Sequence, residues 1–142
     1  MTALDVCEPQ VIRALEKDGW QILRKPLPIR VPGRTVFADF SIRRIFDGQE
    51  EQIVVVEVKC FTNPDHDLQE FYAAIGQYQF YQGALQLIGV NVPVYLALPA
   101  EVYERFVNDP TIMIVLKNAL INLLVVDIVK EELVQWLSYP KS

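Results

Sequence analysis

The sequence predicts one mixed α/β domain with a central β-sheet flanked by helices. Three observations lead to this expectation. The chain has 142 residues, 51% of them hydrophobic, which is enough for one continuous core and too few for two ordinary domains. Runs of β-branched residues alternate with segments whose apolar residues recur at helical spacing. No repeat, low-complexity tract or linker divides the sequence, so we expect residues 1–142 to form a single domain.

The first segment, Asp5 to Asp18, predicts an opening helix, because its apolar residues fall near helical spacing and Gly19 follows, where a helix commonly stops. Pro9 is acceptable in the first turn, since its missing N–H would have no intrahelical partner there. From Trp20 to Val31 two prolines interrupt the apolar residues, which favours an irregular or edge strand. Pro32-Gly33 then predicts a turn.

Two β-rich runs follow, Thr35 to Phe46 and Gln52 to Phe61. Asp47-Gly48 lies between them and favours a tight reversal, so we expect an antiparallel hairpin. The second run is almost continuously β-branched from Ile53 to Val58, as in a strand covered on both faces. We therefore place it in the middle of the sheet.

The second half of the chain alternates helices and strands. Asp65 or Asp67 is expected to cap a long helix that runs through Leu85 or beyond. The elements expected after it are a strand over Val92–Leu98, helices over Pro99–Val107 and Thr111–Ala119, a strand over Ile121–Ile128 and a closing hairpin strand over Glu131–Leu137. The hydrophobic positions 90–98 and 121–126 offer core strands, or alternatively an exposed edge for a homodimer.

Composition excludes several classes of protein. No run of about 18 to 20 apolar residues occurs, so no membrane span is expected. Met1 to Glu8 lacks the basic head and apolar stretch of a secretory signal, and we expect a cytoplasmic protein. Cys7 and Cys60 are far apart and lack paired-ligand spacing, which argues for two reduced thiols and against a disulfide or zinc site. The single His66 receives no role.

Charge is unevenly distributed along the chain, whose net charge is -5. Residues 24–46 carry six basic residues against one acid, a balance of +5, so the rest of the chain sums to -10. This polarity would suit one face that meets a polyanion such as DNA and another that repels it. A solvated basic hairpin explains the charge equally well.

Opposite charges stand near the end of the predicted central strand. Glu57 and Lys59 project from the same face, because side chains alternate along a strand. A structural ion pair between them would satisfy both charges. Alternatively, hairpin pairing brings Asp39 alongside Glu57, and two neighbouring carboxylates repel unless a cation lies between them.

A hard divalent cation such as Mg²⁺, or Mn²⁺ in its place, would supply that charge. It would polarise a phosphate oxygen and lower the pKa of a bound water, while Lys59 orients the water or stabilises the transition state. Gln77 and Tyr81 are four residues apart on one face of the long helix, which could lie beside the site. The alternative is that Tyr81 packs in the core and Gln77 bonds to the backbone.

The ordered set of Asp39, Glu57-Val58-Lys59, and Gln77 with Tyr81 resembles the acid, E-x-K and Q-x-x-x-Y series of the PD-(D/E)xK nuclease superfamily, especially its RecB-like branch. The resemblance implies a restriction-endonuclease-like core. It also implies that these five residues form the catalytic site of a metal-dependent endodeoxyribonuclease.

A narrower resemblance covers nearly the whole chain. The XisH family, known as the fdxN element excision controlling factors of cyanobacteria, is similar in four segments: Ala14–Trp20, Val56–Lys59, Gly76–Tyr78 and Leu96–Tyr103. This resemblance implies a part in removing a DNA element during heterocyst formation, alongside a site-specific recombinase and the partner protein XisI. It does not by itself imply cleavage.

One position departs from the family pattern. Glu8 stands near the first helix where the resemblance leads us to expect a histidine. Glu8 is either an additional metal contact, as helix acids are in many PD-(D/E)xK enzymes, or a solvated residue that favours the positive end of the helix dipole.

Two hypotheses of different classes follow. The first is a DNA-rearrangement factor that cleaves phosphodiesters with a divalent metal. The second is a non-catalytic regulator on a nuclease scaffold that binds an XisI-like protein, a recombinase or DNA. A toxin and antitoxin pair is compatible with the first hypothesis but is indicated by no residue.

Overall fold

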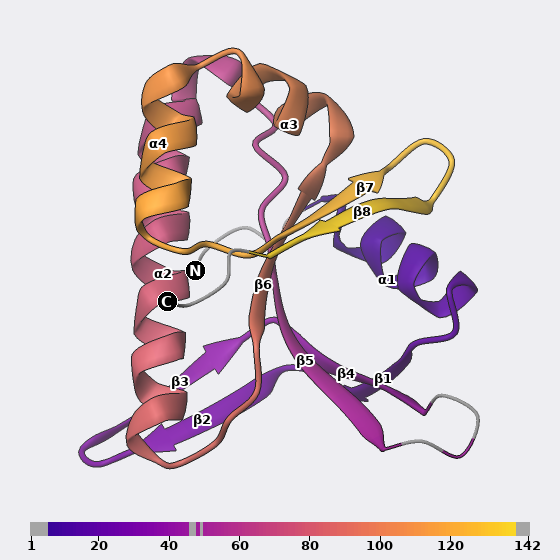
Figure 1. Cartoon of the computed structure of the whole chain (residues 1–142), viewed down its shortest axis with the longest axis vertical. Coiled ribbons are helices and arrows are strands. Elements are labelled where there is room, and N and C mark those ends of the chain that lie inside the picture. Colours follow the sequence, from indigo (N-terminus) through magenta and orange to yellow (C-terminus); the bar gives the residue numbers. More distant parts are fainter. Residues whose placement is uncertain (1–5, 46–47, 49, 139–142) are drawn as a thin grey trace.

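A mixed β-sheet with strand order β1-β4-β5-β6-β7-β8 forms the centre of the computed structural model, which describes residues 6–45, 48 and 50–138 (Figure 1). Strands β1, β4 and β5 pair antiparallel, β5, β6 and β7 pair parallel, and β8 returns antiparallel to β7. The six strands are β1 (Gln21–Arg24), β4 (Phe40–Ile45), β5 (Glu51–Val58), β6 (Val94–Pro99), β7 (Leu123–Asp127) and β8 (Glu132–Leu137).

Helices cover both faces of this sheet (Figure 1). On one face lies α1 (Glu8–Lys17), and on the other lie α2 (Asp67–Leu87), α3 (Ala100–Val107) and α4 (Pro110–Asn118). A short 3-10 helix, η1 (Pro64–His66), precedes α2, and a separate two-stranded sheet is formed by β2 (Leu27–Val31) and β3 (Arg34–Ala38). The predicted mixed α/β fold is confirmed, and it is consistent with a restriction-endonuclease-like arrangement.

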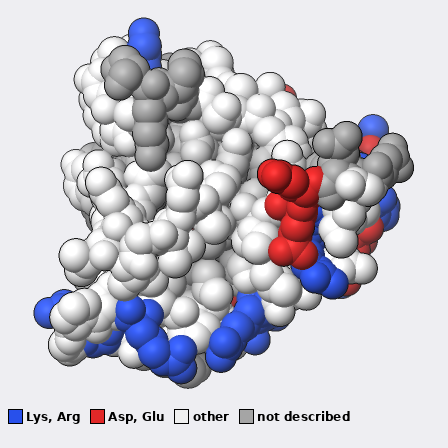
Figure 2. Space-filling model, turned by 60° about the horizontal axis from the view of Figure 1, so that its bottom comes forward, with Lys and Arg blue, Asp and Glu red and all other residues white. Residues whose placement is uncertain are grey.

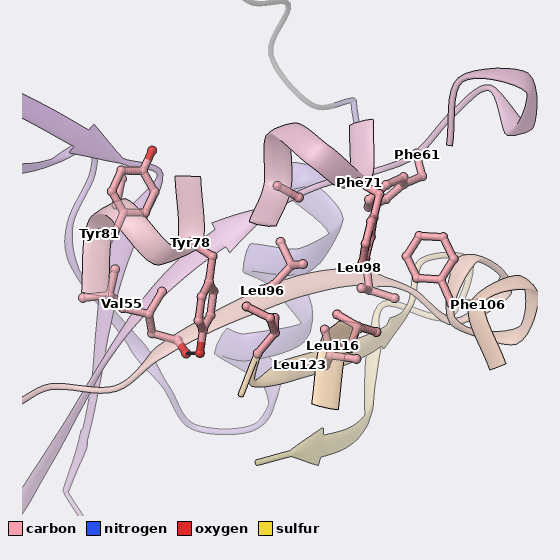
Figure 3. Packing of buried hydrophobic residues seen from close by; sticks show 14 of the residues in the cluster. Val55, Phe61, Phe71, Tyr78, Tyr81, Leu96, Leu98, Phe106, Leu116 and Leu123 are labelled. Atoms are coloured by element: carbon pink, nitrogen blue, oxygen red, sulfur yellow. Dashed lines mark hydrogen bonds between the residues drawn. The ribbon is translucent and has the colours of Figure 1, made fainter. Parts of the chain in front are cut away.

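Two hydrophobic clusters sandwich β5 because its side chains alternate between the faces. Val54, Val56 and Val58 pack toward α1, whereas Val55 packs toward α2. The α2-side cluster has tyrosines at one end and phenylalanines at the other (Figure 3). The predicted central position of this strand is confirmed, since it pairs with β4 on one side and β6 on the other.

Several element boundaries differ from the sequence-based expectation. The run from Thr35 to Phe46 is two strands, because the chain bends at Asp39 and pairs with different partners on either side. The segment from Trp20 to Val31 likewise supplies both β1 and β2. The predicted turn at Pro32-Gly33 is confirmed, and it closes the β2–β3 hairpin. The antiparallel hairpin of β4 and β5 is confirmed, but Asp47 of its expected reversal lies outside the described residues.

The expected cap of the long helix is wrong. His66 occupies the N-cap position of α2 without a side-chain hydrogen bond, and Asp67 is the first helical residue. The Asn63 side chain instead accepts from the Asp65 N–H at the start of η1. The suggested dimer edge is also wrong, because β6 and β7 each have a hydrogen-bonded neighbour on both sides.

The expectation of two reduced cysteines is wrong. Cys7 and Cys60 form a disulfide with their Cα atoms 5.8 Å apart, and both residues are buried. The bond joins the start of α1 to the segment that follows β5. Separation along the sequence did not reveal this pairing, because only the packing of α1 on the sheet brings the two positions together.

Among the helices in the described part of the chain, none combines the length and the apolar character needed to cross a bilayer.

Candidate active site at the end of β5

Asp39 and Glu57 lie side by side where β4 begins and β5 ends. The register pairs Phe40 with Val56, so the bend at Asp39 falls next to Glu57. The N–H of Asp39 donates to Glu57 Oε1 over 3.1 Å, and the N–H of Val58 donates to Asp39 Oδ2 over 2.7 Å. Each carboxylate therefore accepts a hydrogen bond from the main chain at or next to the other acid. These two bonds fix the positions of Asp39 and Glu57 relative to each other.

Glu57 is almost fully enclosed, with 4% of its surface exposed. Burial of a charged carboxylate costs several kcal/mol unless it is paired or hydrogen-bonded. Alternation along β5 directs its side chain to the α2 side of the sheet, as for Val55. The Asp39 N–H donates a hydrogen bond to this carboxylate, and the Tyr81 hydroxyl, whose pKa is raised by burial, is near enough for the Glu57 charge to raise that pKa further.

Tyr81 ties α2 to the acid pair. Its hydroxyl donates to the carbonyl oxygen of Phe37, near the end of β3, over 2.9 Å. Burial raises the pKa of Tyr81, and the negative charges of Glu57 and Asp39 raise it further. Tyr81 is consequently a neutral hydrogen-bond donor at physiological pH. The interpretation of Tyr81 as core is confirmed in that it belongs to the α2-side cluster, although its hydroxyl faces the acids.

Lys59 follows the last residue of β5. Its backbone N–H donates to the carbonyl of Ala97, which continues the sheet pairing, and its side chain is partly exposed. Within the described residues, Lys59 makes no ion pair with a carboxylate. The alternative prediction of a structural ion pair between Glu57 and Lys59 is therefore wrong. Alternation places the Lys59 side chain on the same side as Glu57.

Gln77 lies one helical turn before Tyr81 and lines the same shallow hollow. The lining residues are Arg34, Val36, Gly76, Gln77, Phe80 and Tyr81. Gln77 Oε1 is buried and accepts no hydrogen bond from the described residues, so the alternative of a backbone-bonded amide fails for this oxygen. A role for Gln77 in a reaction stays a prediction.

Glu8 begins α1 and is 7% exposed, so the interpretation of a solvated helix-start residue is wrong. Its carboxylate lies 3.8 Å from the ammonium of Lys25. Its neighbour Cys7 is bonded to Cys60, which holds this end of α1 near the end of β5. No group of three or more acidic, cysteine or histidine residues able to hold a metal occurs in the described part of the chain. The structure thus brings Asp39, Glu57 and Tyr81 together, without Glu8 as a third acid.

The chemistry of the acid pair fits a small divalent cation. Magnesium commonly takes one or two protein carboxylates and completes its shell with water and phosphate oxygens. Asp39 and Glu57 supply two oxygen ligands of that kind, and their bonds to the main chain fix where they stand. A larger all-protein cage is not required.

Sequence reasoning missed a second hollow, of about 480 Å³, on the α1 side of the sheet. The ring of Trp136 lies 5.5 Å from that of Trp20 and 5.0 Å from that of Tyr95, measured between centroids, and Arg44 stands over Trp20. Trp20 directly precedes β1, and the other three residues come from β4, β6 and β8, so no local sequence motif predicts the hollow.

The fold and the paired acids define a class of protein first: a mixed α/β protein of restriction-endonuclease-like arrangement with two carboxylates at the end of a central strand. The family follows from comparison. A family model described as XisH protein matches residues 1–134, and the chain belongs to the XisH family.

Two solved structures are similar to this chain. An XisH family protein from Nostoc punctiforme PCC 73102 is 33% identical, with a TM-score of 0.84 over 94% of this chain and 100% of that one. A fdxN element excision controlling factor protein from Anabaena variabilis is also 33% identical, with a TM-score of 0.82 over 94% of this chain and 98% of that one. No curated protein matches significantly.

Proposed function

We propose that this chain is a DNA-rearrangement factor that controls excision of a DNA element by metal-dependent cleavage of a phosphodiester, with a site of PD-(D/E)xK type. The observation that carries the proposal is the pair of Asp39 and Glu57, each hydrogen-bonded to the other's main chain, with Lys59 directly after the strand that carries Glu57. The description of the similar protein from Anabaena variabilis as an excision controlling factor supports the biological setting.

Each residue has a stated part in the proposed reaction. Asp39 and Glu57 would hold Mg²⁺ or Mn²⁺, which would supply a Lewis acid for the phosphate and a more acidic water. The water oxygen attacks phosphorus and gives its proton to solvent, while the bond to the leaving deoxyribose oxygen breaks and that oxygen takes a proton from solvent. Lys59 orients the water or stabilises the negative charge that develops on phosphate. Tyr81 holds α2 beside the acid pair through its bond to Phe37, and Gln77 supports the site from the preceding turn of α2. Glu8 is a weaker candidate for a further metal contact.

The test of cleavage uses branched, linear and supercoiled DNA with Mg²⁺ or Mn²⁺. The wild-type chain is expected to nick or cut at least one substrate, and Lys59→Ala to lose roughly 10²- to 10³-fold in rate, the usual effect of removing one transition-state donor. Lys117→Ala, an exposed change on α4, is the matched control and should retain full activity. Cleavage that persists undiminished in Lys59→Ala would assign the activity to another site or to a contaminant.

A non-catalytic regulator on the same scaffold is the second candidate. It is favoured by the hydrogen bonds that Asp39 and Glu57 already make within the protein, and by the charge of -10 outside the basic segment, which suits protein partners. Its partners would be an XisI-like protein, a site-specific recombinase or DNA. Calorimetric titration separates the two: a regulator binds XisI but takes up neither Mg²⁺ nor Mn²⁺.

A further inference from the structure

The hairpin of β2 and β3 is a ribbon that stands apart from the main sheet, at the lower left of Figure 1. The segment that builds it, residues 27–38, contains two arginines and no acidic residue, and Arg24 and Lys25 directly precede it. Five paired positions join the two strands, and a two-residue turn at Pro32-Gly33 closes them. At about 3.3 Å per residue the ribbon is about 16 Å long.

The two faces of the ribbon differ. Ile29 pairs with Val36 on the inner face and packs against the α2-side cluster. On the outer face Arg30 pairs with Thr35, and both side chains are exposed. Phe37, also on this outer face, is 57% exposed. The apolar inner face explains why the ribbon folds against the helix, but it does not explain the exposed outer face.

The two arginines of the ribbon, Arg30 and Arg34, are exposed and form no salt bridge in the described part of the chain, and the same holds for Arg24 at the end of β1. The basic residues of β4 differ, since Arg43 pairs with Glu51 and Arg44 with Asp18. Figure 2, which brings the lower end of the molecule forward, shows Lys and Arg side chains gathered along its lower edge. Uncompensated arginines on one protruding element attract phosphate.

The ribbon is held firmly against the acid pair. Tyr81 donates to the carbonyl of Phe37 in β3, and Asp39 is the residue that directly follows this strand. A polyanion bound along the ribbon would therefore lie close to the carboxylates rather than at an unrelated surface.

We propose that the turn end of the β2–β3 ribbon is a binding surface for duplex DNA, with Arg30 of its outer face and Arg34, at the rim of the hollow beside Gln77, on the phosphates. A two-stranded ribbon fits the major groove of B-DNA, which is about 12 Å wide. The inference rests on the proposed action on DNA, but it does not depend on cleavage, since a regulator would use the same surface.

The test measures binding of the full-length chain to a labelled duplex by fluorescence anisotropy, in EDTA, so that cleavage plays no part. Arg30→Ala with Arg34→Ala is expected to lower the slope of log affinity against log salt by about 2 units between about 50 and 200 mM salt. The control removes the same charge elsewhere, through Arg13→Ala with Lys117→Ala on α1 and α4, and should leave the slope nearly unchanged. Circular dichroism confirms that both double variants are folded.

Three results would overturn the ribbon as the binding surface: no binding of duplex DNA by the wild-type chain at low salt, an unchanged slope in the ribbon variant, or an equal loss in the control. An equal loss in the control would mean that the charge of the whole molecule, and not the ribbon, attracts the DNA. Tighter binding of single-stranded than of duplex DNA would also contradict the proposal. If the chain binds DNA through the ribbon but never cuts it, the proposed nuclease activity is refuted and the ribbon remains a DNA-binding surface.

Discussion

Asp39 and Glu57 are held by reciprocal bonds to each other's main chain: Glu57 Oε1 accepts from the N–H of Asp39, and Asp39 Oδ2 accepts from the N–H that follows Glu57. The pair is therefore structural whether or not it binds metal. A loss of activity in a variant of either acid therefore has two explanations, a lost metal ligand and a destabilised fold. The free energy of unfolding must be measured alongside the affinity for metal.

Substitutions of Asp39 separate these explanations. Asp39→Ala leaves the Val58 N–H without its acceptor and should lower the free energy of unfolding by about 1–3 kcal/mol. Asp39→Asn keeps an oxygen in place and should cost less, yet it removes the negative charge and should weaken Mn²⁺ binding as strongly as Asp39→Ala does. Urea unfolding and calorimetry measure the two effects. Equal stability of all three proteins would show that the bond to Val58 contributes nothing.

Glu8 can be tested as a metal contact by Glu8→Gln. Because no third acid groups with Asp39 and Glu57 among the residues that the structure describes, we expect the affinity for Mn²⁺ to stay within about twofold of wild type, which is under 1 kcal/mol. Lys25→Gln, which removes the partner of Glu8, serves as the matched control. A fall in affinity comparable with that of Asp39→Asn would instead make Glu8 a ligand.

Tyr78 predicts a change of stability at alkaline pH. Its buried hydroxyl donates to Val94 O over 2.9 Å and accepts from the Asn122 N–H over 3.0 Å, and burial raises the pKa of Tyr78 to about 12. At neutral pH, Tyr78→Phe should cost about 1–3 kcal/mol, because two main-chain groups lose a partner.

The cost should shrink between about pH 10 and pH 12. In this range the unfolded tyrosine loses its proton while the folded one keeps it, so the wild type loses about 1.4 kcal/mol of stability per pH unit that the phenylalanine variant does not. Denaturant titrations at several pH values measure the difference, with the exposed Tyr72→Phe as control. A gap that stays constant over these pH values would contradict the assignment.

The disulfide between Cys7 and Cys60 predicts a stability that depends on reductant. The two residues are 53 positions apart, and opening a loop of this size typically costs about 2–4 kcal/mol. Unfolding in urea with and without a thiol reductant should show this loss, and Cys7→Ser with Cys60→Ser should reproduce it without responding to reductant. Two freely alkylated thiols in the denatured, unreduced protein would show that the bond does not form.

Local sequence was a good guide wherever one short segment determines the outcome. The β-branched residues of β5 predicted a strand covered on both faces, and α2 was recognised from its length and spacing. The pairing of the hairpin also predicted that Asp39 and Glu57 would meet, because register follows from the adjacent strands. These features depend on periodicity and on contacts between segments close in sequence.

Contacts between distant segments were not predictable in this way. The bend at Asp39, the bond from Tyr81 to Phe37 and the disulfide to Cys60 each need the packing of one layer on another.

The amino-acid sequence by itself determined the alternation of strands and helices, the central strand with its charged end, and the basic segment, since each is a property of neighbouring residues. Only the tertiary structure decided that Glu8 is buried beside Lys25, that β6 and β7 each pair with a strand on both sides, and that Arg30 and Arg34 form no ion pair with any acid among the described residues. The physical reason is that burial and charge pairing depend on distances in space, which the order of residues does not specify until the layers have packed.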